Sequence, residues 1–162
     1  MLGPLAAAAP TDVARQRDVA RADIGLAIVE LQRGRIAAAR SEAANVERRL
    51  GPLFEKTHDT EAGRALAEGR LAAAEAAERS GDRAGALTLR ESALSVVRSV
   101  LTSKSKRVIA TQARALIALG RLDEARPIVT ELLRMNYRQP LLIQAWKAKG
   151  GVLDSALASK SR

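Results

Sequence analysis

The chain has 162 residues, a formal net charge of +9, 47% hydrophobic residues and no cysteine. This length suits one domain with a core of its own, and the absence of cysteine excludes a disulfide framework and thiolate chemistry. Aromatic residues make up only 2% of the chain, so the core must be aliphatic. Helices rich in alanine can pack closely, and stacked helical hairpins favour such a core.

The first ten residues, MLGPLAAAAP, lack the basic residues that begin a signal peptide, and Pro4 interrupts their apolar stretch. We predict a disordered leader over residues 1–10. No apolar run approaches the roughly 18 residues that a transmembrane helix requires. We therefore expect a cytoplasmic protein with no membrane span, and leave open a periplasmic location or a place within a larger protein.

The first predicted helix runs from a cap at Thr11 or Asp12 to about Gln32, and aliphatic residues cover most of its circumference in the second half. A helix that is apolar nearly all round is typical of one packed between neighbours. The alternative is a surface for a further repeat or for a second copy. Oligomerisation through this first helix therefore stays open.

A glycine follows this helix in the stretch R-G-R-I-A-A-A-R, residues 33–40. A turn at Gly34 predicts a second helix to about Leu50, ended by Gly51-Pro52. Without that turn, residues 12–50 would form one long helix, because glycine inside a helix costs only about 1 kcal/mol. Residues 53–59 are then a connector holding His58, the only histidine, which is too isolated to form a metal site.

The third helix is predicted from Glu61 to about Arg79, and two glycines could end it. Gly69 lies in a repeat-like stretch, but we favour a turn at Gly81, because Asp82 can cap the next helix. Gly81 also lies 39 residues before Gly120, and a conserved phase is better evidence than one glycine. A fourth helix follows from about residue 84 to 101, and its apolar spacing predicts four buried side chains: Leu87, Leu94, Val97 and Leu101.

The clearest pattern runs from Ser105 to Tyr137, where two amphipathic helices meet at Gly120. We expect Ser103 or Ser105 to cap the first helix and Asp123 to cap the second. After Pro140 a short helix should pack Leu142 and Trp146 on the core, with Lys147 and Lys149 outward, before Gly150-Gly151 ends it. Residues 152–158 could add a further turn.

The segment L-G-R-L-D-E-A, residues 119–125, resembles the turn and second-helix start of a tetratricopeptide repeat (TPR). In that family a small residue precedes the turn glycine by about seven positions and an alanine follows it by five, as Ala113, Gly120 and Ala125 do here. Leu116 and Val129 replace the usual aromatic residues. The resemblance implies an all-α fold of three stacked antiparallel helical hairpins plus a C-terminal capping helix. This single domain would span residues 11–158, before a frayed tail at residues 159–162.

Hairpins of the TPR family stack into an array whose concave face binds peptides or proteins, and the chain is similar to TPR-containing C-terminal regions of bacterial signalling proteins. The resemblance therefore implies a non-catalytic protein-interaction scaffold. The carboxylate-clamp positions of some TPR domains are Ala110, Arg114 and Ala118 here, in place of the expected asparagine and lysine. Binding of chaperone tails is therefore not implied.

The positive charge is concentrated late in the chain, because residues 101–162 hold twelve basic and four acidic side chains. In the TPR register, Arg107 and Arg114 would project into the concave groove, and arginine forks suit carboxylates. We therefore predict an acidic peptide or protein partner, bound by seven basic residues: Lys104, Lys106, Arg107, Arg114, Arg121, Arg138 and Lys147.

No catalytic motif, phosphate loop or metal-ligand cluster is recognisable, and we predict neither an enzyme nor a cofactor. Asp123 and Glu124 are adjacent, but neighbouring helical side chains point about 100° apart. The alternative function is an RNA- or DNA-binding helical repeat. Single-strand binders add stacking aromatics to a basic groove, and only Tyr137 and Trp146 are available for that purpose.

Overall fold

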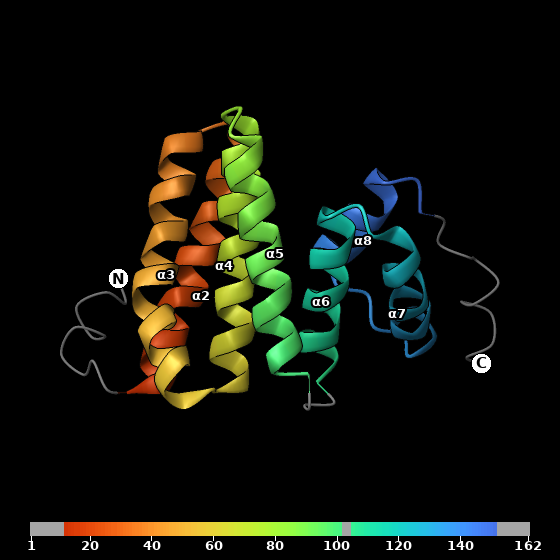
Figure 1. Cartoon of the computed structure of the whole chain (residues 1–162), viewed down its shortest axis with the longest axis horizontal. Helices are drawn as coiled ribbons and strands as arrows, with labels where there is room; N and C mark the ends of the chain where they lie inside the picture. Colours follow the sequence, from red (N-terminus) through yellow and green to blue (C-terminus); the bar gives the residue numbers. More distant parts are fainter. Residues whose placement is uncertain (1–11, 102–104, 152–162) are drawn as a thin grey trace.

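The computed structural model describes residues 12–101 and 105–151 of the chain (Figure 1). All regular secondary structure in these residues is helical, which confirms the all-α prediction. There are seven helices: α2 (Val13–Gln32), α3 (Ile36–Thr57), α4 (Thr60–Arg79), α5 (Arg83–Ser99), α6 (Lys106–Ala118), α7 (Leu122–Arg134) and α8 (Pro140–Ala148). The predicted leader, Lys104, the Thr11 and Ser103 caps, the turn after residue 151 and the frayed tail lie outside the described residues.

Figure 1 shows the four long helices α2 to α5 side by side, with α6, α7 and α8 beyond α5. Helices that follow each other from α2 to α7 pack against each other in turn. In addition, α2 contacts α4, α4 contacts α6, and α6 contacts α8. The even-numbered helices therefore form a continuous row, and every helix contributes to one aliphatic core.

Three glycine turns close the pairs α2–α3, α4–α5 and α6–α7. Gly34, Gly81 and Gly120 have φ values of 73°, 88° and 74°, a conformation that glycine adopts without steric cost. The N–H after each glycine donates to the carbonyl oxygen five residues earlier, at 2.9 Å each time: Arg35 to Glu30, Asp82 to Ala77, and Arg121 to Leu116. Residues 12–50 are therefore two helices, and the preferred turn at Gly81 is confirmed.

Each glycine turn has a buried alanine seven residues before it and another five residues after it. All six alanines are at most 1% exposed: Ala27 and Ala39, Ala74 and Ala86, and Ala113 and Ala125. A side chain this small allows two helices to approach closely where they cross. The three hairpins therefore all bury a small residue at the same two positions.

Gly69, the alternative to Gly81 as the predicted turn, lies inside α4. A Cβ atom at this position would come within 2.5 Å of Val46 Cγ1 on α3. The glycine thus allows α3 to pack directly on the α4 backbone.

The predicted end of the second helix at Leu50 is wrong, as is the connector over residues 53–59. α3 continues through Gly51-Pro52 to Thr57, and Asp59 caps α4 by accepting a hydrogen bond from the Ala62 N–H. Phe54 is 8% exposed and lies against Gly63 of α4. Burial of this last turn outweighs the hydrogen bond that proline removes.

Details of the later helices also differ from the prediction: α5 ends at Ser99, and Leu101, predicted to be buried in it, is half-buried beyond its end. Leu87 is 53% exposed, because Ala86 rather than Leu87 faces the core and aligns with the buried Ala93, Leu94 and Val97. Arg121, not Asp123, occupies the cap position of α7, since each hairpin's second helix begins two residues after its glycine. At the equivalent position Asp82 does cap α5, as predicted.

The short helix α8 covers the carboxyl end of the core as predicted. Leu142 and Trp146 are 0% and 5% exposed, whereas Lys147 and Lys149 are exposed. No helix within residues 12–101 and 105–151 is both long and apolar enough to cross a membrane.

Candidate ligand-binding cleft

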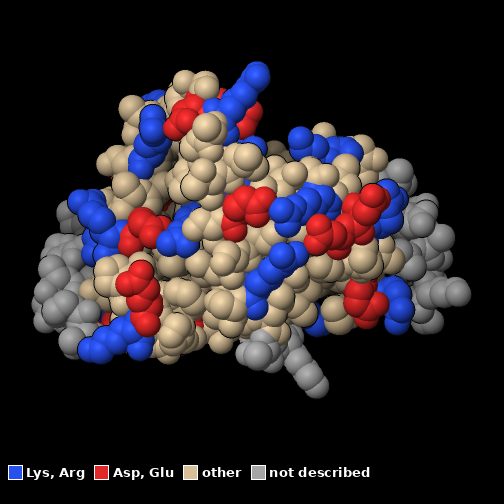
Figure 2. Space-filling model, in the orientation of Figure 1, with Lys and Arg blue, Asp and Glu red and all other residues tan. Residues whose placement is uncertain are grey.

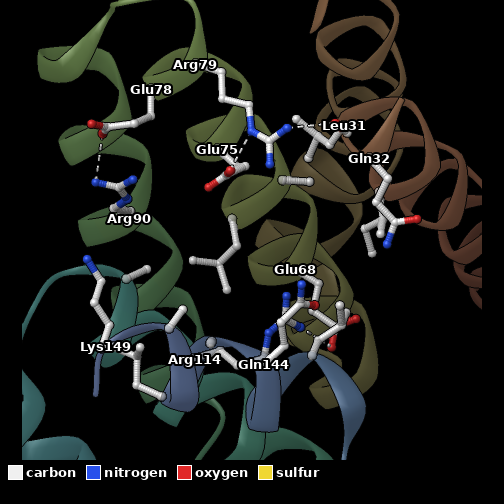
Figure 3. Close-up of a pocket in the computed structure, with 18 residues that line it drawn as sticks. Leu31, Gln32, Glu68, Glu75, Glu78, Arg79, Arg90, Arg114, Gln144 and Lys149 are labelled. Carbon is white, nitrogen blue, oxygen red and sulfur yellow. Dashed lines mark hydrogen bonds and ion pairs between the residues drawn. The ribbon is translucent and has the colours of Figure 1, made fainter. Parts of the chain in front are cut away.

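A cleft of about 510 Å³ opens between α2, α4, α5, α6 and α8 (Figure 3). Half of its lining is aliphatic: Ile28, Leu31, Leu71, Ala72, Ile117, Ala118, Leu141, Ala145 and Ala148. The other half is polar or charged: Gln32, Glu68, Glu75, Glu78, Arg79, Arg90, Arg114, Gln144 and Lys149. A volume of this size is typical of sites that hold a small ligand or a few side chains of a peptide.

Glu68 of α4, which lines this cleft, is shared by two arginines, the buried Arg64 and the half-buried Arg114. Arg64 Nη1 lies 2.8 Å from Glu68 Oε2, and Thr111 Oγ1 donates to Glu68 Oε1 at 3.2 Å. Arg114 Nη1 lies 3.6 Å from Glu68 Oε1, which is longer than a hydrogen bond. Arg114 therefore forms an ion pair with Glu68, but it lies farther from this carboxylate than Arg64 does.

The ion pairs continue from Arg64 towards α2. Arg64 Nε lies 2.9 Å from Glu61 Oε2, and Arg21 Nη2 of α2 approaches the same oxygen at 3.3 Å. One chain of charged groups thus crosses the row α2, α4 and α6. It ends at Arg114, whose side chain is 14% exposed.

The pKa values of Arg64 and Arg114 shift in opposite directions. Burial lowers the pKa of Arg114, Glu68 offsets this only in part, and Arg64 lowers it further, so the pKa of Arg114 is lowered. Burial also lowers the pKa of Arg64, but Glu68 and Glu61 together outweigh it, so the pKa of Arg64 is raised. Of the two arginines beside Glu68, Arg114 has the longer contact with the carboxylate, 3.6 Å against 2.8 Å for Arg64.

Paired charges occupy the opposite end of the cleft. Arg79 Nε pairs with Glu75 Oε1 at 2.7 Å and Arg79 Nη1 donates to the Leu31 carbonyl oxygen at 2.7 Å, which ties α4 to the end of α2. Arg90 Nη1 lies 3.1 Å from Glu78 Oε2. With four basic and three acidic side chains, the lining has a net charge of +1. Figure 2 likewise shows acidic and basic side chains interspersed across one face of the molecule.

Of the seven basic residues predicted to bind a partner, Arg114 alone is among the residues that line this cleft. Arg107 is exposed near the start of α6, next to Lys106, and Arg121 pairs with Glu91 of α5 at 2.7 Å. Arg138 is exposed after α7, and Lys147 is exposed on α8. Lys104 lies outside the described residues. The structure therefore distributes the six described members over several surfaces.

The acidic residues of the cleft and the basic residues from earlier in the chain were not predicted, although their spacing from the turn glycines could have located them. Counted back from each turn glycine, positions 2, 3 and 6 all line the cleft in all three hairpins: Gln32, Leu31 and Ile28; Arg79, Glu78 and Glu75; Ala118, Ile117 and Arg114. Net charge over a segment gives no such positional information. Positions counted from the turn glycines do give this information.

The described residues provide neither a metal site nor an exposed tryptophan. No group of three or more acidic, histidine or cysteine side chains within residues 12–101 and 105–151 could hold a metal ion. Trp146 is buried, and the Arg126 guanidinium lies 6.0 Å from the centre of its ring. Its indole is therefore not available for stacking on a nucleic-acid base.

Comparison of the chain with known protein families, curated proteins and solved structures found no match.

Proposed function

We propose that this chain is a non-catalytic, TPR-like helical-repeat module that binds a peptide segment of a partner protein in the cleft between α2, α4, α5, α6 and α8. The observation that carries the proposal is Arg114, a half-buried arginine that lies 3.6 Å from its carboxylate partner Glu68 in a cleft whose lining is half aliphatic. A cation in an apolar recess favours a ligand that combines apolar side chains with a carboxylate.

The repetition of the hairpins supports the TPR-like arrangement. Three glycine turns of one geometry, each with buried alanines seven residues before and five after, recur along the chain. The first helices of the hairpins contact each other in succession and their equivalent positions line the cleft. In helical-repeat proteins the surface formed by such a row is the usual binding face.

The cleft's charge favours a segment with a single acidic group over a strongly acidic one. Glu75 and Glu78 are engaged by Arg79 and Arg90, so these four groups nearly cancel. The remaining charged groups of the lining are the cations Arg114 and Lys149 and the carboxylate of Glu68, which also pairs with Arg64. One ligand carboxylate beside Arg114, from a side chain or from a chain end, satisfies this excess.

A peptide-display selection tests the proposal. Random 12-residue peptides are selected on the whole chain, and the enriched sequences should combine aliphatic residues with one Asp, Glu or free C-terminal carboxylate. Calorimetry with an enriched peptide should show binding weakened about tenfold or more by Arg114→Gln, since a charged hydrogen bond contributes about 1.5–3 kcal/mol. Arg107→Gln on the same helix is the matched control, because Arg107 is exposed outside the cleft and its loss should leave the affinity unchanged.

The alternative, a nucleic-acid-binding repeat, is examined by titrating a labelled single-stranded oligonucleotide at low and high salt. A phosphate-binding protein loses affinity linearly on a log–log plot of affinity against salt concentration. Tight, salt-sensitive oligonucleotide binding with no enriched peptide would replace the peptide proposal. Equal peptide affinity for Arg114→Gln and the wild-type chain would place the binding site elsewhere.

A further inference from the structure

The outer face of α2 is apolar and exposed, and it lies apart from the cleft. Leu26 is 50% exposed and Val29 37%, two of only four large hydrophobic side chains exposed to this extent among the described residues. Ala22 and Gly25 are exposed beside them, and a Cβ atom at Gly25 would meet nothing within 4 Å. On a helix these four positions form one stripe, at i, i+3, i+4 and i+7.

When a second copy of α2 runs in the opposite direction, small residues of this stripe face large residues of the other copy. If a second copy of α2 packs antiparallel with its two-fold axis between Gly25 and Leu26, Ala22 of each copy lies level with Val29 of the other. The small residue on one copy then faces the larger residue on its partner, and the two Leu26 side chains meet near the axis. Close approach of this kind is what small residues at a helix contact allow.

The same two-fold arrangement brings opposite charges together at the ends of the stripe. In that register Asp18 of one copy lies level with Arg33 of the other, and both side chains are well exposed, at 62% and 58%. Within one copy Asp18 pairs with Arg21 at 3.2 Å and Arg33 with Glu30 at 3.5 Å, both exposed contacts between neighbouring turns. Such pairs are weak and can be exchanged at little cost.

We infer that α2 is a homodimer interface, in which two copies of this chain pack antiparallel through Ala22, Gly25, Leu26 and Val29. The apolar stripe supplies the affinity, and the Asp18–Arg33 pairs set the register. Of the α2 residues that line the cleft, Leu31 lies opposite this stripe on the helix, and Ile28 and Gln32 lie along one edge of it. Each subunit therefore keeps its cleft open, and the dimer presents two of them. A two-fold interface that repeats one patch on both subunits is the commonest form of oligomer.

Sedimentation equilibrium over a range of concentrations is the first test. The expected mass rises from 17.3 kDa towards twice that value, because one helix face gives a small interface and a correspondingly weak dimer. Leu26→Glu should hold the chain at the monomer mass without changing its melting temperature. Leu87→Glu is the matched control, since Leu87 is an equally exposed leucine on α5, at 53%, and it should leave the dimer intact.

Charge exchange tests the register. Asp18→Arg and Arg33→Asp should each weaken dimerisation by up to about fivefold, as expected for exposed ion pairs. The double variant should return the dissociation constant to within about twofold of the wild-type value, because the pairs are re-formed with their signs reversed.

Because the chain contains no cysteine, single cysteines give a second, independent readout. Leu26→Cys should cross-link to itself under mild oxidation, since the two positions are offset by only about 1.5 Å along the axis. Ala22→Cys should not, because the same geometry separates its two copies by about 10 Å along the axis.

Three results would overturn the inference. The first is a mass of 17.3 kDa at every concentration. The second is a monomer whose melting temperature falls with Leu26→Glu, since this would mean that the chain covers the face itself. The third is equal cross-linking at positions 22 and 26, which would indicate a parallel or non-specific contact. None of these results bears on whether the cleft binds a peptide.

Discussion

Among single residues, Glu68 is the carboxylate that two arginines and a threonine hydroxyl share. It accepts from Thr111 and neutralises Arg64, and it lies beside Arg114 as well. Arg64 is 6% exposed, so the charge of Glu68 is needed where water cannot replace it. Removing one partner of a buried ion pair costs far more than the pair itself contributes, and without the charge of Glu68 the buried Arg64 would keep only Glu61 as a carboxylate partner among the described residues.

Glu68→Gln should therefore lower the free energy of unfolding by about 3 kcal/mol, measured by urea denaturation. Glutamine keeps the size of the side chain and can still accept from Thr111, so the loss reports on charge. The matched control is Glu91→Gln, which breaks an exposed pair with Arg121 and should cost less than about 1 kcal/mol. Equal effects of the two substitutions would show that the Glu68 cluster is well hydrated.

At the scale of helices, the crossing of α3 over α4 depends on Gly69. Alanine is normally the better helix residue, by about 1 kcal/mol. At position 69, however, the added methyl group would meet the Val46 side chain at 2.5 Å. Steric conflict and helix propensity thus act in opposite directions, and the local packing decides the sign.

We predict that Gly69→Ala destabilises the chain by about 1–3 kcal/mol, the usual cost of overpacking a core. Gly25→Ala, at an exposed position of α2 with nothing within 4 Å, should instead stabilise it by up to about 1 kcal/mol. Both are measured by thermal unfolding of the monomer at low concentration. Stabilisation by both substitutions would mean that α3 can shift away from α4 without loss.

Helix existence and turn positions could be predicted here, because glycine at a left-handed turn is a local requirement that leaves a trace in the sequence. Gly34, Gly81 and Gly120 all turn the chain as the pattern indicates. The extension of α3 through Pro52 could not be predicted in the same way, since it depends on Phe54 finding a place against α4. Long-range packing of this kind overrides a local helix-breaking signal.

The cleft was less predictable than the fold for a related reason. A net charge over residues 101–162 says how many cations are present, but not which of them share a surface. Arg79 and Arg90 come from outside that segment, and Glu68, Glu75 and Glu78 cancel much of the positive charge at the cleft. Positions relative to the turn glycines carry that information, because the residues 2, 3 and 6 positions before each of the three glycines all line the cleft.

At the scale of the whole molecule, one core runs through all seven helices but is not equally connected. α4 contacts α2, α3, α5 and α6, whereas the main contacts of α7 are with α6 and those of α8 are also with α6. A helix that packs against fewer neighbours has a lower free energy of local opening. The carboxyl-terminal helices, held through one neighbour, should therefore open before α2 to α5.

Leu132→Asp tests both the burial of α7 and this uneven connection. Leu132 is fully buried, so an unpaired carboxylate there should cost several kcal/mol. Hydrogen exchange followed by mass spectrometry should show loss of protection first in α7 and α8, with α4 still protected, and the cooperative melting of the wild-type chain should broaden. Leu87→Asp is the control, because that leucine is 53% exposed and its replacement should change neither measurement. Uniform loss of protection in all seven helices would show instead that the chain unfolds as one unit, since the damage at α7 would then propagate through α6 into every hairpin.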